Sequence, residues 1–73
     1  MRLTRHAKNR LRFIQRRAPS LTESRLLEAL GSASVMGEDP KGNRRVSIRL
    51  DDVLLLVVVD EAKEIVITIW REE

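Results

Sequence analysis

The chain has 73 residues, 42% of them hydrophobic and 34% charged, with only 3 Gly and 2 Pro. This length and composition predict one small folded domain over residues 1–73 rather than a disordered tail. The absence of cysteine excludes a disulfide scaffold, a Cys-ligated zinc site and thiol catalysis. The longest apolar run, Val53–Val59, has seven residues. Because a bilayer-spanning helix needs roughly 18, we expect no membrane segment.

The charge is unevenly distributed along the chain. The net charge of +3 combines +7 over residues 1–25 with −4 over residues 26–73. A domain with one basic end is typical of proteins that meet an anionic polymer or an acidic partner. No apolar segment that could serve as a secretory signal precedes Phe13, and a cleaved transit peptide would leave fewer than fifty residues, so the cytoplasm is the expected compartment.

Two helices are predicted first. Thr4 is a suitable N-cap, and apolar residues follow it at helical spacing: Ala7, Leu11, Ile14 and Ala18. This pattern predicts a helix over 5–17, which Pro19 ends. Thr22 is the N-cap expected for a second helix over 22–30, with Gly31 as its C-cap.

Strand patterns follow the second helix. The sequence predicts a short strand over 33–36 and longer strands over 44–50, 53–59 and 64–70, separated by polar turns. The run from Val53 to Val59 is apolar on both faces, so we expect it at the centre of the sheet. The predicted fold class is therefore α+β, with two N-terminal helices packed on a 3–4-stranded antiparallel β-meander.

The first helix carries two groups of basic residues. On a helical wheel the outer group faces solvent: Arg5, Lys8, Arg12 and Arg16. A second group lies on the flank between core and water: His6, Arg10, Phe13 and Arg17. A histidine with arginines along one flank can hold a phosphate while the imidazole exchanges a proton. The alternative is a partly buried histidine beside a solvated basic face.

The strands carry the other candidates. Arg45, Ser47 and Arg49 share one strand face, and simple alternation puts Thr68 on a face with Val66 and Trp70. We expect Trp70 to cover the core rather than stack on bases. With Phe13 as the only other aromatic residue, the sequence lacks the stacking surface typical of single-strand RNA readers.

The sequence lacks the residues that several common kinds of site require. One histidine without cysteine does not make a conventional zinc site, and neither a calcium loop nor a Gly-rich phosphate loop is present. We therefore expect no metal and no organic cofactor. RNA cleavage is compatible with this set, because the 2′-hydroxyl is a built-in nucleophile that the protein needs only to orient and deprotonate.

Short motifs across nearly the whole chain resemble a family of small bacterial domains. The motifs are Thr4-Arg5-His6-Ala7-Lys8-Asn9-Arg10, Leu21-Thr22-Glu23, Val57-Val58-Val59-Asp60 and Ile65-Val66-Ile67-Thr68-Ile69-Trp70. The family opens with T-x-H-A-x-x-R and ends with an I-x-T-x-aromatic strand, and it is similar to RelE-like toxins of the barnase–EndoU–colicin–RelE superfamily. The resemblance implies a two-helix, four-stranded antiparallel core and metal-independent ribonuclease activity.

The resemblance also implies roles for individual residues. His6 would be the general acid or base, Arg10 and an arginine from the Arg45/Arg49 face would hold the phosphate, and Thr68 would orient the reactants, with His6, Arg10, Arg49 and Thr68 as the catalytic candidates. The remaining basic candidates would bind RNA: Arg5, Lys8, Arg12, Arg16, Arg17 and Arg45. Implied partners are RNA, with or without the ribosome, and a cognate antitoxin protein that docks on an exposed strand edge.

Two alternatives stay open at this point. The basic helix could dock on nucleic acid or on an acidic protein without catalysis, which predicts a steep salt dependence that His6→Ala leaves unchanged. A structural or dimerising domain with a solvated basic helix is the third interpretation, and it predicts no binding of RNA or DNA at low salt.

Overall fold

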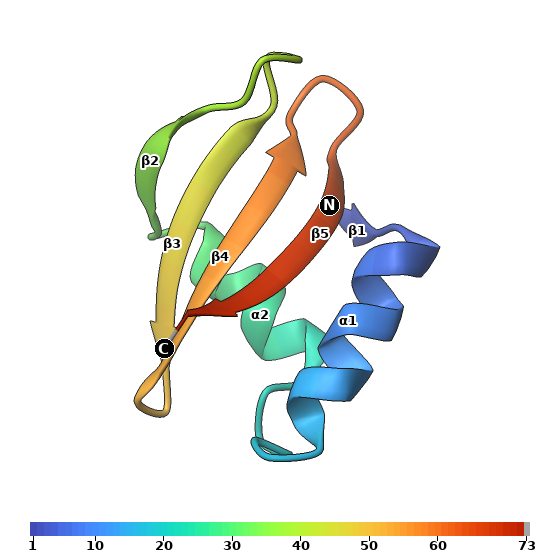
Figure 1. The fold of residues 1–73 in the computed structure, drawn as a ribbon, viewed down its shortest axis with the longest axis vertical. Coiled ribbons are helices and arrows are strands. Elements are labelled where there is room, and N and C mark those ends of the chain that lie inside the picture. The colour runs from blue at the N-terminus through green and yellow to red at the C-terminus, as the bar shows by residue number, and fades with distance from the viewer. Residues whose placement is uncertain (73) are drawn as a thin grey trace.

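The structure is a computed structural model that describes residues 1–72. The elements in chain order are β1 (Arg2–Leu3), α1 (Arg5–Gln15), α2 (Glu23–Leu30), β2 (Ser34–Glu38), β3 (Arg44–Leu50), β4 (Val53–Asp60) and β5 (Ile65–Glu72). One sheet takes up all the strands, and both helices lie on the same face of it (Figure 1). The α+β class is therefore confirmed.

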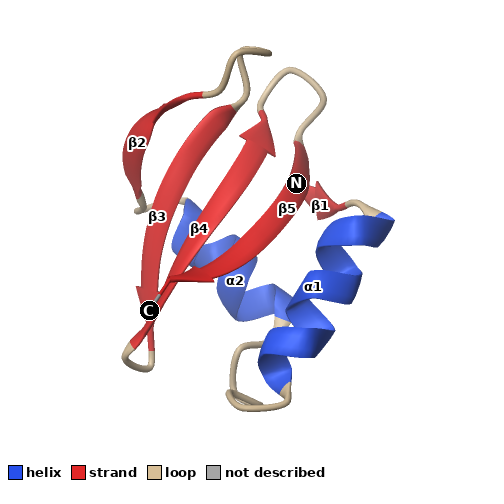
Figure 2. Cartoon of the chain, in the orientation of Figure 1, coloured by secondary structure: helices blue, strands red, loops and turns tan. Residues whose placement is uncertain are grey.

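The sheet has five strands in the order β1-β5-β4-β3-β2 (Figure 2). Strands β2 to β5 form the expected antiparallel meander, whereas β1 pairs in parallel with β5 through Arg2 opposite Ile65 and Leu3 opposite Val66. The expectation of a purely antiparallel sheet of three or four strands is wrong in this respect. A strand of two residues has no periodicity to detect, and its partner lies more than sixty residues away along the chain.

Each helix begins at a threonine cap. The side chain of Thr4 accepts a hydrogen bond from the Ala7 amide at 3.1 Å, and that of Thr22 accepts one from the Arg25 amide at 3.2 Å. Helix α1 ends at Gln15 instead of the predicted residue 17. Residues 16 and 17 form a tighter turn, because their backbone amides donate hydrogen bonds to the carbonyls of residues 13 and 14.

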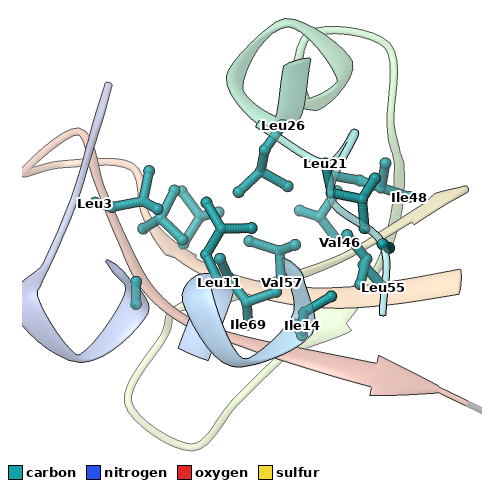
Figure 3. Close-up of a cluster of buried hydrophobic side chains, with 14 residues drawn as sticks. Leu3, Leu11, Ile14, Leu21, Leu26, Val46, Ile48, Leu55, Val57 and Ile69 are labelled. Carbon is teal, nitrogen blue, oxygen red and sulfur yellow. The ribbon is translucent and has the colours of Figure 1, made fainter. Parts of the chain in front are cut away.

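The core lies between the helices and one face of the sheet. Figure 3 shows side chains from β1, both helices and the long strands meeting there. Its fully buried members include Ala7, Leu26, Leu55, Val57 and Ile69. Among the described residues, no helix lies over the opposite face of the sheet (Figure 1).

A bulge in β5 changes which side chains face this open side. Val58 pairs with Thr68 but Val59 pairs with Val66, so Ile67 is the additional residue. Val66 is buried in the core, whereas Thr68 and Trp70 point to the open face together with Val58 and its row. The expectation that Thr68 shares a face with Val66 is therefore wrong, because the bulge interrupts the alternation.

The β3–β4 hairpin is held to the helical layer. Its two turn residues, Asp51 and Asp52, have φ of 49° and 63°, as a tight two-residue hairpin requires. Arg25 of α2 reaches the Asp51 carboxylate at 2.6 and 3.1 Å, and the Ser20 hydroxyl also donates to it. We call Ser20, Arg25 and Asp51 the corner cluster. The hydrogen bonds from Arg25 and Ser20 lower the pKa of Asp51 to about 2.

Within residues 1–72, no helix combines the length and the apolar composition that crossing a membrane would require.

Candidate functional site

Helix α1 lies along the outer edge of β5, where β1 leaves that edge unpaired (Figure 1). The side chains of its N-cap, Thr4, and of Arg10 donate hydrogen bonds to carbonyl oxygens of this edge. The Thr4 hydroxyl donates to the Ile67 carbonyl at 3.0 Å, and Arg10 Nε donates to the Ile69 carbonyl at 3.2 Å. The side chains thus take the place of a neighbouring strand and fix α1 against β5.

This docking brings His6 to Thr68. His6 Nε2 lies 3.0 Å from Thr68 Oγ1, and the tautomer of the ring decides which of the two donates. Thr4 caps the helix two residues before His6 and bonds to the bulge one residue before Thr68. His6 is exposed and Thr68 is half-buried, so a solute can reach this pair from solvent.

The Arg10 guanidinium lies between the only two aromatic residues of the chain. Its central carbon is 5.8 Å from the Phe13 ring centroid and 5.5 Å from that of Trp70, and the Arg16 guanidinium lies 5.6 Å from Phe13. These distances are within the range of cation–π attraction. The rings themselves are accessible, since Phe13 is 60% and Trp70 50% exposed.

The position of Trp70 overturns one expectation. It does not cover the core, because the bulge turns it to the open face of the sheet. Both exposed rings also lie beside Arg10, an arrangement that two aromatic residues far apart in sequence did not suggest.

Arg10 and three further arginines line one cavity of about 450 Å³, which we call the basic pocket. Its lining consists of Arg10, Phe13, Ile14, Arg16, Arg17 and Arg71. Like charges gathered at one cavity repel one another, and an anion relieves this repulsion. Guanidinium groups also present paired N–H donors that match phosphate oxygens.

None of the basic residues of α1 is neutralised within residues 1–72. The ion pairs of that part of the chain are Arg25–Asp51 at 2.6 Å and Arg44–Glu61 at 3.0 Å, and both lie on other elements. Of the outer group, Arg5, Lys8 and Arg12 are exposed on the helix, whereas Arg16 lines the basic pocket together with Arg17 from the flank.

The two strand arginines are separated by the sheet register. Arg45 pairs with Val58, which pairs with Thr68, so Arg45 lies in the row of Thr68 about 10 Å away across two strand spacings. Arg49 pairs with Leu54 and lies two rows further along the strand. Of the two candidates, the structure therefore brings Arg45 and not Arg49 towards His6 and Thr68.

A groove of about 480 Å³ runs over the open face beside this row, and we call it the sheet groove. Its floor is formed by Leu56, Val58, Ile67, Thr68 and Trp70. The turn over residues 39–43 and Arg45 form one wall. The Asp39 carboxylate in this wall accepts bonds from the amides of residues 41 and 43, and the bond from the Asn43 amide is the main reason that its pKa is lowered.

Sequence reasoning missed three residues that line the basic pocket or the sheet groove. Phe13 was noted on the helix flank but given no role, Arg71 lies at the end of β5, and Leu56 was taken as part of a strand apolar on both faces. The helical wheel places Phe13 with Arg10 and Arg17, so its signal was available. Arg71 had no such signal, since only the strand pairing brings it to α1.

Within residues 1–72, His, Asp and Glu side chains form no group of three that could hold a metal ion. Comparison of the chain with family models, curated proteins and solved structures finds no match.

Proposed function

We propose that this protein binds RNA along the α1–β5 flank and cleaves it without a metal by attack of the RNA 2′-hydroxyl. The contact between His6 and Thr68, next to Arg10, carries the proposal. It puts an imidazole on Thr68 and a fixed guanidinium on the neighbouring residue of β5, on a surface that solutes can reach.

The residues supply three functions that the reaction needs. The arginines of the basic pocket bind the phosphates that flank the scissile bond. Arg10, held by the Ile69 carbonyl through Nε, keeps its terminal N–H groups for the phosphate that reacts. Thr68 orients the His6 ring through their hydrogen bond.

The proposed cleavage is an attack of the RNA 2′-oxygen on the neighbouring phosphorus. Neutral His6 takes the proton of the 2′-hydroxyl, and the 2′-oxygen forms a bond to phosphorus. The bond from phosphorus to the 5′-oxygen breaks, and water protonates the leaving oxygen. The products are a 2′,3′-cyclic phosphate and a 5′-hydroxyl end. Arg10 stabilises the additional negative charge that develops on the phosphate oxygens.

A cleavage assay with excess chelator tests this proposal. Free single-stranded RNA and ribosome-bound messenger RNA are incubated with wild type, His6→Ala and the control Asn9→Ala, which removes an exposed polar side chain from the same helix. We expect wild type and Asn9→Ala to leave cyclic phosphate ends, and His6→Ala to be slower by about 100-fold or more. Equal rates for wild type and His6→Ala would remove His6 from the chemistry.

A second candidate function is RNA binding without cleavage. It is favoured by the basic residues of α1, which have no acidic partner within residues 1–72. It predicts that RNA stays intact with every variant and that His6→Ala binds as tightly as wild type. A cognate antitoxin remains a prediction of the family resemblance, and co-purification with the protein of a neighbouring gene would test it.

A further inference from the structure

We infer that the sheet groove is a base-binding subsite, and that the protein therefore selects RNA with unpaired bases. This inference rests on the proposed RNA binding and deepens it, since the basic pocket alone would accept any polyphosphate chain. The occupant of the groove is a nucleobase whose neighbouring phosphates lie on Arg10 and Arg45.

The groove has the chemistry of a base site. Its floor is apolar, with Leu56, Val58 and Ile67 beside the ring of Trp70. Trp70 is 50% exposed and pairs with Leu56 of β4 on one side only, because β1 reaches no further along β5 than Val66. A large aromatic surface therefore faces solvent. Such a surface stabilises a flat, weakly hydrated partner, and base stacking on aromatic side chains is its common use in single-strand binding.

The charges around the groove agree with a nucleotide rather than with an apolar segment of protein. Arg10 contacts Trp70 at one side, while Lys41 and Arg45 line the wall opposite. The one carboxylate in that wall, Asp39, is engaged by amides of its own turn. An apolar floor between cations suits a base joined to phosphates.

The position of the groove links it to the proposed chemistry. Thr68 belongs both to the groove floor and to the His6 contact, and it lies two residues, about 7 Å, from Trp70 along the strand. A nucleotide seated on Trp70 therefore has its sugar and phosphate next to His6 and Arg10. A base within a duplex cannot leave its stack to reach this floor without unpairing.

Trp70 provides a direct probe, because the chain has one tryptophan and no tyrosine. Its intrinsic fluorescence is recorded while wild type is titrated with a short single-stranded RNA, with the same RNA as a duplex, and with inorganic polyphosphate. We expect the single strand to quench the fluorescence strongly and to bind more tightly than the duplex. Polyphosphate should bind with little quenching, since it carries the charge without bases.

Variants separate the ring from the charges near it. Trp70→Ala should weaken binding of labelled single-stranded RNA about tenfold and leave polyphosphate binding unchanged, while Trp70→Phe retains most of the affinity. Met36→Ala is the matched control, since it removes an exposed apolar side chain of β2 that lies outside the groove. Circular dichroism establishes that each variant is folded.

The outcomes distinguish the inference from the function on which it rests. If wild type binds single-stranded RNA but Trp70→Ala binds it equally well, or loses RNA and polyphosphate affinity to the same extent, the base subsite is refuted and RNA binding stands. If wild type binds no RNA at low salt, the proposed function and the subsite are refuted together.

Discussion

Two regions of this small domain use arginine in opposite ways. In the corner cluster, Arg25 is paired with Asp51, and the pair connects α2 to the β3–β4 hairpin. On the α1–β5 flank, Arg10 has aromatic rings and a carbonyl oxygen as its neighbours, and Arg16 and Arg17 face a cavity with more positive charge. An arginine whose charge is already neutralised serves the fold, whereas an arginine held in place without a carboxylate is available to a ligand.

The comparison predicts that stability and RNA affinity can be changed separately, and the largest effect is expected from the core beside the corner cluster. Leu21 is fully buried and follows Ser20 in the linker between the helices. Leu21→Ala should lower the free energy of unfolding by about 2–5 kcal/mol, because it leaves a cavity in a small core. Chemical denaturation followed by circular dichroism measures this loss.

The same variant should bind RNA like wild type under conditions in which it is folded. Met36→Ala, which truncates an exposed side chain, serves as its control and should change stability by less than about 0.5 kcal/mol. A folded Leu21→Ala protein with much weaker RNA binding would show that the two regions are coupled.

The second prediction compares two triple variants with the same change in net charge. Arg16, Arg17 and Arg71 are replaced by Gln in one, and Arg5, Lys8 and Arg12 in the other. The pocket variant should lose about 10- to 100-fold in RNA affinity, and the slope of log K against log salt should fall by about 2, because three phosphate contacts are lost. The outer variant should lose only several-fold.

Fluorescence anisotropy of labelled RNA at several salt concentrations makes this comparison. Thermal unfolding should differ little between the two variants, since none of the six residues takes part in an ion pair within residues 1–72. Equal losses of affinity in both variants would mean that net charge, and not the basic pocket, determines binding.

The third prediction concerns the pH dependence of the corner cluster. The pKa of Asp51 is lowered to about 2 from its ordinary 3.8 by the bonds from Arg25 and Ser20. The ionised carboxylate therefore stabilises the fold fully above about pH 4, and this contribution is lost as the pH falls towards 2. Asp51→Asn should lower the melting temperature at pH 7, and its difference from wild type should shrink through that window.

The control for this prediction is Asp52→Asn, the neighbouring turn residue, which lies outside the corner cluster. Its melting temperature should follow that of wild type across the same pH range. A difference between Asp51→Asn and wild type that stays constant down to pH 2 would contradict the assigned cause.

Local patterns predicted most of the fold but not its first strand. Both threonine caps, the helical stripes and the alternation in β3 are properties of neighbouring residues, so they can be read without tertiary information. Strand β1 has two residues and owes its conformation to Ile65 and Val66, which lie at the other end of the chain. Pairing over that distance is decided by the assembled sheet and not by the local sequence.

The candidate site, like the fold, could be predicted where it depends on local sequence patterns. The helical wheel grouped His6, Arg10 and Arg17 on one flank of α1, and they lie on the side that faces β5 or the basic pocket. The face of Trp70 was not predictable from alternation, because the bulge at Ile67 shifts the period by one residue. That single residue turns the aromatic ring from the expected core to the open sheet.

The smallest effect is expected at the contact between His6 of α1 and Thr68 of β5, which tests whether this part of the flank serves the chemistry or only the fold. Thr68→Val keeps the shape of the side chain but removes the oxygen that lies 3.0 Å from His6 Nε2. Since a hydrogen bond of this kind contributes about 0.5–1.5 kcal/mol, we expect RNA cleavage to slow by about two- to tenfold while RNA affinity is unchanged. Thr68→Ser keeps the hydroxyl and should cleave like wild type. If Thr68→Val cleaves at the wild-type rate, the hydrogen bond between Thr68 and His6 only docks α1 against β5. This contact would then serve the fold, as the corner cluster does.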